Sequence, residues 1–225
     1  MATFPTAAAV GAALSALKAQ VSSAWCEALA AACQRHGIDT PARVAAFLAN
    51  ICHESNGLRA GAESLNYTPE RLMALFGRTG RITAADAQRL GRKPGEGPLP
   101  EARQQAIANL IYGGAFGLRN LGNRQPNDGW YFRGKGPLQL TGRANHTAFA
   151  KAIGVDVVAL QDMLLTPEGG AESAAAFWTA KGCNACADCG DAAGHRRLVN
   201  GGSFGLDEVR KGTGAALQAL LPFVR

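Results

Sequence analysis

The spacing of apolar residues along this chain indicates helices far more often than strands. The clearest helix begins at the Thr40-Pro41 pair, a typical N-cap and first turn, and runs to Asn56-Gly57, a typical helix stop. Within it, apolar side chains recur at i, i+3, i+4 and i+7, the spacing of one helical face: Val44, Phe47, Leu48 and Ile51. The pattern therefore predicts an amphipathic helix that ends in the sequence Cys-His-Glu.

Weaker versions of the same pattern recur along most of the chain. They predict helices at 22–37, 69–90 (as one or two short helices), 101–112, 142–153, 168–181, 184–199 and 207–221. Loops are expected at the Pro- and Gly-rich stretch 91–100 and at the Gly- and Asn-rich stretch 113–136. Strand signal is confined to YFRGKGPLQLT, which fits one short hairpin. The predicted fold class is mainly α.

Length and composition limit the class of protein. A chain of 225 residues, 47% hydrophobic and 18% charged, fits one large domain or one domain with a small subdomain, and excludes a disordered chain. No apolar run approaches the roughly 18 residues of a membrane span, so none is expected. The N-terminal apolar stretch has no basic residue ahead of it, and we therefore expect no cleaved signal peptide.

The six cysteines are expected to be reduced thiols in the absence of a secretion signal. Cys183, Cys186 and Cys189 recur every three residues, and with His195 they could bind zinc or an iron–sulfur cluster. Free cysteine also packs well as a small buried hydrophobe. We expect the packing role, with no metal and no cofactor.

Positive charge is concentrated in one segment. The chain carries a net charge of +6, and residues 71–103, here called the basic segment, hold a large share of its cations: Arg71, Arg78, Arg81, Arg89, Arg92, Lys93 and Arg103. Such a segment is a solvated surface or the binding site of a polyanion. Nucleic acid, anionic lipid and the anionic bacterial cell wall all qualify, and charge alone does not choose among them.

Two glutamates are the strongest chemical signal. Glu54 lies in the last turn of the predicted helix, on or beside its apolar face. We expect burial and the negative end of the helix dipole to raise its pKa, as a general acid working near neutrality requires. Glu63 follows in the loop-like segment GAESLNYT and can face Glu54 across a groove. Two carboxyl groups held roughly 6.5 to 9.5 Å apart leave room for a water, as in an inverting glycosidase.

Four ordered strings make the interpretation specific. CHESNGL, ESLNYT, DGWYFRGKGPLQLTGRANH and LVNGG occur in this order between about residues 40 and 205. Together they resemble glycoside hydrolase family 19, in the short form of phage endolysins and bacterial chitinase-like proteins. The resemblance implies one lysozyme-like helical catalytic domain over residues 1–225. A small helical lobe at about 69–112 would form one side of the substrate groove.

The resemblance also implies roles for individual residues. Glu54 corresponds to the general acid, Glu63 to the general base, and Thr141 to the hydroxyl residue that orients the attacking water. The substrate-binding positions correspond to His53, Tyr67, Gln139, Asn145 and Asn200.

The chain departs from the family pattern at three places. Asn56 and Leu58 replace a glycine and an aromatic residue after the HES string, and His146 stands where a Tyr or Trp is common. In addition, GCNACADCGD stands where relatives tend to have GLNALADAGD.

The leading hypothesis is a monomeric, peptidoglycan-degrading endolysin that cleaves β-1,4 bonds of the wall glycan by an inverting mechanism. It would be made in the bacterial host cytoplasm and would act in the periplasm or wall after holin-dependent release or delivery. A chitinase acting on N-acetylglucosamine polymers is the alternative enzyme. A basic wall-binding or nucleic-acid-binding protein is the alternative outside enzymes. Nucleic-acid binding is not expected, because it leaves the HES, ESLNYT and QLTG strings unexplained.

Overall fold

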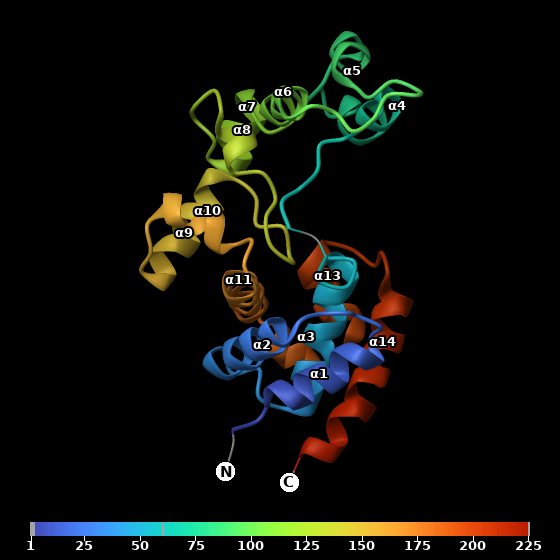
Figure 1. The fold of residues 1–225 in the computed structure, drawn as a ribbon, viewed down its shortest axis with the longest axis vertical. Helices are drawn as coiled ribbons and strands as arrows, with labels where there is room; N and C mark the ends of the chain where they lie inside the picture. The colour runs from blue at the N-terminus through green and yellow to red at the C-terminus, as the bar shows by residue number, and fades with distance from the viewer. Residues whose placement is uncertain (1–2, 60, 225) are drawn as a thin grey trace. The chain divides into compact units, whose positions relative to one another are not determined.

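The computed structural model describes residues 3–59 and 61–224, and its regular structure is helical (Figure 1). The prediction of a mainly α fold is confirmed. No helix in these two ranges is both long enough and apolar enough to span a membrane. The chain divides into two compact units: the first comprises Met1–Gly61, Gly136–Leu138 and Asp162–Arg225, and the second Ala62–Lys135 and Gln139–Gln161. The lobe predicted at about 69–112 lies within the second unit, which extends beyond it at both ends.

The first unit is a bundle of helices packed around α3. Figure 1 shows α3 among α1, α13 and α14. The helices of this unit are α1 (Ala7–Ala16), α2 (Ser23–Arg35), α3 (Pro41–Glu54), α11 (Pro167–Ala180), α12 (Cys183–Asp188), α13 (Ala192–Asn200) and α14 (Leu206–Leu220), followed by the short 3₁₀ helix η3 (Leu221–Phe223).

The predicted start of α3 is confirmed, but its amphipathic character is not. The Thr40 hydroxyl accepts a hydrogen bond from the Arg43 N–H at 3.2 Å, and Pro41 occupies the first turn. However, every residue from Val44 to Cys52 is buried. A helix covered on all sides is a core helix. The end of α3 is therefore held firmly by the packing of the first unit.

The second unit has its own smaller core. Its helices are α4 (Pro69–Leu72), the π-helical turn η1 (Met73–Gly77), α5 (Ala84–Leu90), α6 (Glu101–Ile111), α7 (Gly114–Phe116), the π-helical turn η2 (Gly117–Leu121), α8 (Asp128–Tyr131) and α9 (Arg143–Ile153), while α10 (Val157–Met163) begins in this unit. The buried core includes Leu65, Leu72, Phe76, Ile82, Leu90, Leu99, Ile107 and Ile111. Thr83 caps the start of α5, because its hydroxyl accepts a hydrogen bond from the Asp86 N–H at 3.0 Å.

Two predictions of local structure were wrong, and one helix was missed. The expected loop 113–136 contains α7, η2 and α8, and the Asp128 carboxylate helps to order it by binding two nearby N–H groups and Arg143. The single helix expected at 184–199 breaks into α12 and α13 at Gly190, whose φ is +70°. Helix α10 was not predicted at all. The first two differences depend on a glycine geometry or on a partner farther along the chain rather than on hydrophobic spacing.

The predicted hairpin around residue 135 is present only in a minimal form. Lys135 and Leu140 exchange backbone hydrogen bonds of 3.2 and 2.9 Å, and Lys135 also forms an isolated bridge with Ala62. This turn brings the segment that contains Thr141 close to the segment that contains Glu63, within the second unit.

The cysteines of the 183–189 segment differ in exposure. Cys183 is buried in the core of the first unit, Cys186 is partly buried and Cys189 is exposed. In the described part of the chain, no three His, Cys, Asp or Glu side chains are grouped as metal ligands. His195 instead places Nδ1 3.0 Å from the side-chain amide of Asn50.

Candidate active site

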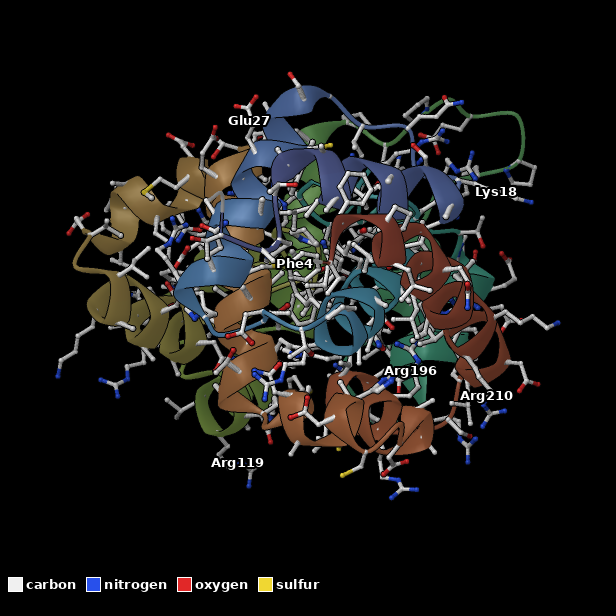
Figure 2. The ribbon with its side chains drawn as sticks, turned by 90° about the horizontal axis from the view of Figure 1, so that it is seen from below. Phe4, Lys18, Glu27, Arg119, Arg196 and Arg210 are labelled. Atoms are coloured by element: carbon white, nitrogen blue, oxygen red, sulfur yellow. The ribbon has the colours of Figure 1, made fainter. Side chains whose placement is uncertain are left out.

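Glu54 ends α3 beside a buried arginine. Its Oε1 lies 2.5 Å from Nη2 of Arg196, whose side chain is only 1% exposed. Arg196 comes from α13, and its guanidinium also donates from Nε to the Phe204 carbonyl at 2.7 Å and from Nη1 to Asn50 Oδ1 at 3.3 Å. Figure 2 shows Arg196 among the helices of the first unit, whereas Arg210 points outward. Three fixed contacts therefore hold the positive partner of Glu54.

The expectation that Glu54 is buried was wrong. Its side chain is 30% exposed, because α3 ends at this residue and the apolar face that covers Ile51 does not continue over it. Asn50 lies one helical turn earlier on the same face and binds the same arginine. The buried member of this ion pair is Arg196, whereas the Glu54 side chain is partly exposed.

His53 and Asn200 both contact Phe204 in the first unit. The His53 ring is 6.2 Å from the ring of Phe204, and it lines an open pocket of about 640 Å³ together with the end of α1 and residues 208–215 of α14. The Asn200 amide donates from Nδ2 to the Phe204 carbonyl at 3.0 Å and accepts from the Gly202 N–H at 2.9 Å. Asn200 thus orders the turn that follows α13, and a direct contact with sugar stays a prediction.

Glu63 lies in the second unit in a drier environment. The Tyr112 hydroxyl donates to both of its carboxylate oxygens, at 2.8 and 3.0 Å, and the Glu63 N–H donates to the Gly134 carbonyl at 2.8 Å. Burial raises the pKa of Glu63 above its ordinary value, while the hydrogen bonds from Tyr112 and Gly134 and the charge of Arg133 partly oppose this. Glu63 is therefore a carboxylate with increased proton affinity and a fixed orientation.

Tyr112 is suited to remain a donor to Glu63. Burial and the adjacent negative charge of Glu63 raise the pKa of the Tyr112 phenol, so it keeps its proton. The same two causes raise the pKa of Tyr67, whose ring packs 6.1 Å from Phe76 in the core of the second unit. Both tyrosines accordingly border the Glu63 carboxylate as neutral groups.

A chain of short contacts links Glu63 to Gln139, Thr141 and Asn145. A Cβ on Gly134 would lie 2.5 Å from the Gln139 side-chain oxygen, so any larger residue there would displace the Gln139 side chain. The Thr141 hydroxyl donates to the Gln139 carbonyl at 2.7 Å, and the Asn145 amide donates to the Thr141 carbonyl at 2.8 Å. The structure thus brings four of the predicted site residues together within the second unit.

His146 has a structural role at the position where the family pattern favours a Tyr or Trp. Its ring is fully buried, 5.2 Å from the ring of Phe132. Burial, with a smaller contribution from Lys135, lowers the pKa of His146 to about 4. His146 is therefore a neutral core residue at physiological pH.

Two site residues were missed by the sequence analysis, Tyr112 and Arg196. Tyr112 ends α6 and meets Glu63 only through the fold, at a sequence separation of 49 residues. Arg196 lies just ahead of the LVNGG string, and that proximity was the only signal that could have drawn attention to it. Arg196 is the partner of Glu54 in the first unit, and Tyr112 is the partner of Glu63 in the second.

Replacing Tyr112 by Phe is expected to move the acidic limb of the pH profile of kcat/KM to higher pH. The Tyr112 hydrogen bond lowers the pKa of Glu63, so its loss raises that pKa further and protonates the base at a higher pH. Activity at neutral pH should fall on the order of 10-fold, the worth of one hydrogen bond to a charged group. An unchanged acidic limb would show that Tyr112 does not tune Glu63.

One curated relative shows the family that the sequence strings resemble. The chain is 31% identical over 182 residues to a glycosyl hydrolase family 19 domain-containing protein of Haemophilus influenzae, which covers 81% of this chain and 82% of that protein. Among solved structures, chitinase C of Streptomyces griseus HUT6037 aligns with a TM-score of 0.46 and 17% identity, over 94% of this chain and 68% of that one. No protein-family model matches the chain.

Proposed function

This chain belongs to glycoside hydrolase family 19, and we propose that it is an endolysin-type enzyme that cleaves β-1,4 glycosidic bonds of peptidoglycan. The observation that carries the proposal is the contrast between its two candidate carboxyl groups. Glu54 is partly exposed beside a fixed arginine, and Glu63 is partly buried beside a tyrosine donor. Hydrolysis with inversion uses two such groups on opposite faces of the sugar.

Each group has a separate part in the proposed reaction. Glu54 donates a proton to the glycosidic oxygen as the bond to the anomeric carbon breaks. Glu63 accepts a proton from the water that attacks that carbon from the other face, and Thr141 orients this water. A raised pKa suits this base, because it strengthens proton abstraction, while the hydrogen bond from Tyr112 favours the ionised form. Arg196 fixes the direction of Glu54 without touching the substrate.

Charge supports an anionic wall polymer over uncharged chitin. In the basic segment, Arg89 and Arg103 form ion pairs with acidic neighbours, and Arg81 packs over the rings of Phe76 and Phe116. Arg71 and Arg78 are exposed, and neither is ion-paired with a described residue. These two arginines are free to attract carboxylates or phosphates of a wall.

Product analysis tests the proposed function. Purified enzyme is incubated with peptidoglycan and, separately, with chitin oligomers, and the products are identified by mass spectrometry. We expect release from peptidoglycan, and the reducing-end sugar identifies the bond that is cut, as muramic acid for a muramidase and glucosamine for a glucosaminidase. Release from chitin alone would make the protein a chitinase. Proton NMR of the first product of a β-linked substrate should show the α-anomer, and a β-anomer would rule out single displacement.

Reversing Arg71 and Arg78 to Glu is expected to weaken co-sedimentation with peptidoglycan at low salt on the order of 10-fold, with little effect at high salt. The matched control reverses Arg210 and Lys181 to Glu, which makes the same change in net charge on exposed positions of the first unit. Thermal unfolding of both double variants should stay close to that of the wild type. Equal loss of binding in both would mean that net charge, and not the basic segment, drives the association.

A further inference from the structure

Phe204 is an exposed aromatic ring that the reaction described above does not use. It is 81% exposed, the highest value among the large hydrophobic residues of the described chain. A single exposed apolar residue is common on protein surfaces. Phe204 differs because hydrogen bonds hold its backbone in place, and because Arg196, which binds its carbonyl, also binds the predicted acid Glu54.

The backbone of Phe204 is fixed from two sides. Its carbonyl accepts one hydrogen bond from Arg196 Nε at 2.7 Å and another from Asn200 Nδ2 at 3.0 Å. Gly205 follows in the left-handed region, with φ +73°, and a Cβ there would collide with the His53 ring. These contacts keep the ring on a defined backbone, so little conformational entropy is lost when a ligand covers it.

The backbone of Phe204 is linked to the predicted acid through Arg196. One guanidinium, that of Arg196, binds both the Phe204 carbonyl and, at 2.5 Å, the Glu54 carboxylate. The His53 ring, one residue before Glu54, approaches Phe204 at 6.2 Å with an interplanar angle of 60°. This is an edge contact, and because Phe204 is 81% exposed it leaves most of the ring open to solvent.

We propose that Phe204 binds substrate by stacking against a sugar ring of the glycan next to the bond that is cut. In a β-1,4-linked pyranose the hydroxyl groups are mainly equatorial, so each face of the ring presents C–H groups that pack on a flat aromatic surface. Water then leaves both apolar surfaces. Asn200 and Arg196 are positioning residues for this platform. The inference rests on the proposed glycan-cleaving site and adds a binding residue to it.

The test compares substitutions of Phe204 with one of Phe223, another exposed phenylalanine of the first unit that is 38% exposed. With soluble glycan strands released from peptidoglycan, Phe204→Ala should raise KM about 10-fold and leave kcat within about twofold, because stacking is equal in the ground and transition states. Phe204→Trp should have a KM close to that of the wild type, whereas Phe204→Leu should keep the raised KM. Phe223→Ala should have the KM of the wild type. Thermal unfolding of all four variants should be similar.

A titration separates this inference from the proposed function. The fluorescence of Phe204→Trp should change when soluble peptidoglycan strands or N-acetylglucosamine hexamer are added, whichever of them the enzyme cleaves. If the wild-type enzyme releases nothing from peptidoglycan, the proposed function is contradicted but the stacking role of Phe204 is not. No fluorescence change with either glycan, an unchanged KM in Phe204→Ala, or full restoration by Phe204→Leu would overturn the stacking role. A change of oligomeric state in Phe204→Ala with KM unchanged would assign the ring to a protein contact instead.

Discussion

Glu54→Gln should lower the rate of peptidoglycan cleavage on the order of 10²- to 10⁴-fold, because the amide has no proton to give to the departing glycosidic oxygen. The amide oxygen can still accept a hydrogen bond from Arg196, which lies 2.5 Å from the native carboxylate. Binding of the wall should therefore persist. Arg196 loses its charged partner, and we expect a lower unfolding temperature but a folded protein. Circular dichroism and co-sedimentation with peptidoglycan check both points.

A change of leaving group distinguishes lost acid catalysis from general damage. An aryl glycoside that releases a dinitrophenolate needs no protonation, so its cleavage should be nearly the same in Glu54→Gln as in the wild type. Arg196→Lys is the second control, because it keeps the charge but not the three contacts of the guanidinium. Arg196→Lys should lower kcat both on peptidoglycan and on the aryl glycoside. Each of these losses should be smaller than the loss that Glu54→Gln causes on peptidoglycan. Substantial peptidoglycan cleavage by Glu54→Gln would remove Glu54 as the acid.

Glu63→Gln should be as damaging as Glu54→Gln, on the order of 10²- to 10⁴-fold, but through loss of the base. In Glu63→Gln, cleavage of the aryl glycoside should be slowed as much as cleavage of peptidoglycan, because the attacking water still has to lose a proton. Added azide should restore turnover, since this anion attacks without deprotonation and gives the glycosyl azide of inverted configuration. Thr141→Ala should cost less, on the order of 10-fold, because a hydroxyl that orients water supplies a hydrogen bond and not the proton transfer.

The same measurements can reverse the assignment. Relief of Glu63→Gln by the aryl substrate, together with azide rescue of Glu54→Gln, would make Glu63 the acid and Glu54 the base. The enclosed setting of Glu63, where burial raises its pKa, makes this exchange a real alternative. The two substitutions therefore test the roles as well as the identities of the residues.

Local features of the sequence were sufficient for most of the helices. Thr40-Pro41 and Thr83 are caps whose hydrogen bonds lie within their own first turns, so their effect does not depend on the rest of the fold. Apolar spacing located α6, α9, α11 and α14 for the same reason. The ordered strings around Glu54, Glu63 and Thr141 identified the family, because they record the residue types that its chemistry requires.

The sequence by itself thus determined the helical class, the family and the residues that are candidates for catalysis. Only the tertiary structure decided the environment of each candidate: that Glu54 is partly exposed beside Arg196, that Glu63 is enclosed beside Tyr112, and that Phe204 is held with its ring open to solvent. The physical reason is that hydrophobic spacing and capping act over a few neighbouring residues. Desolvation, ion pairing and the pKa shifts that they cause arise instead from side chains that are distant in sequence and meet only when the chain has packed.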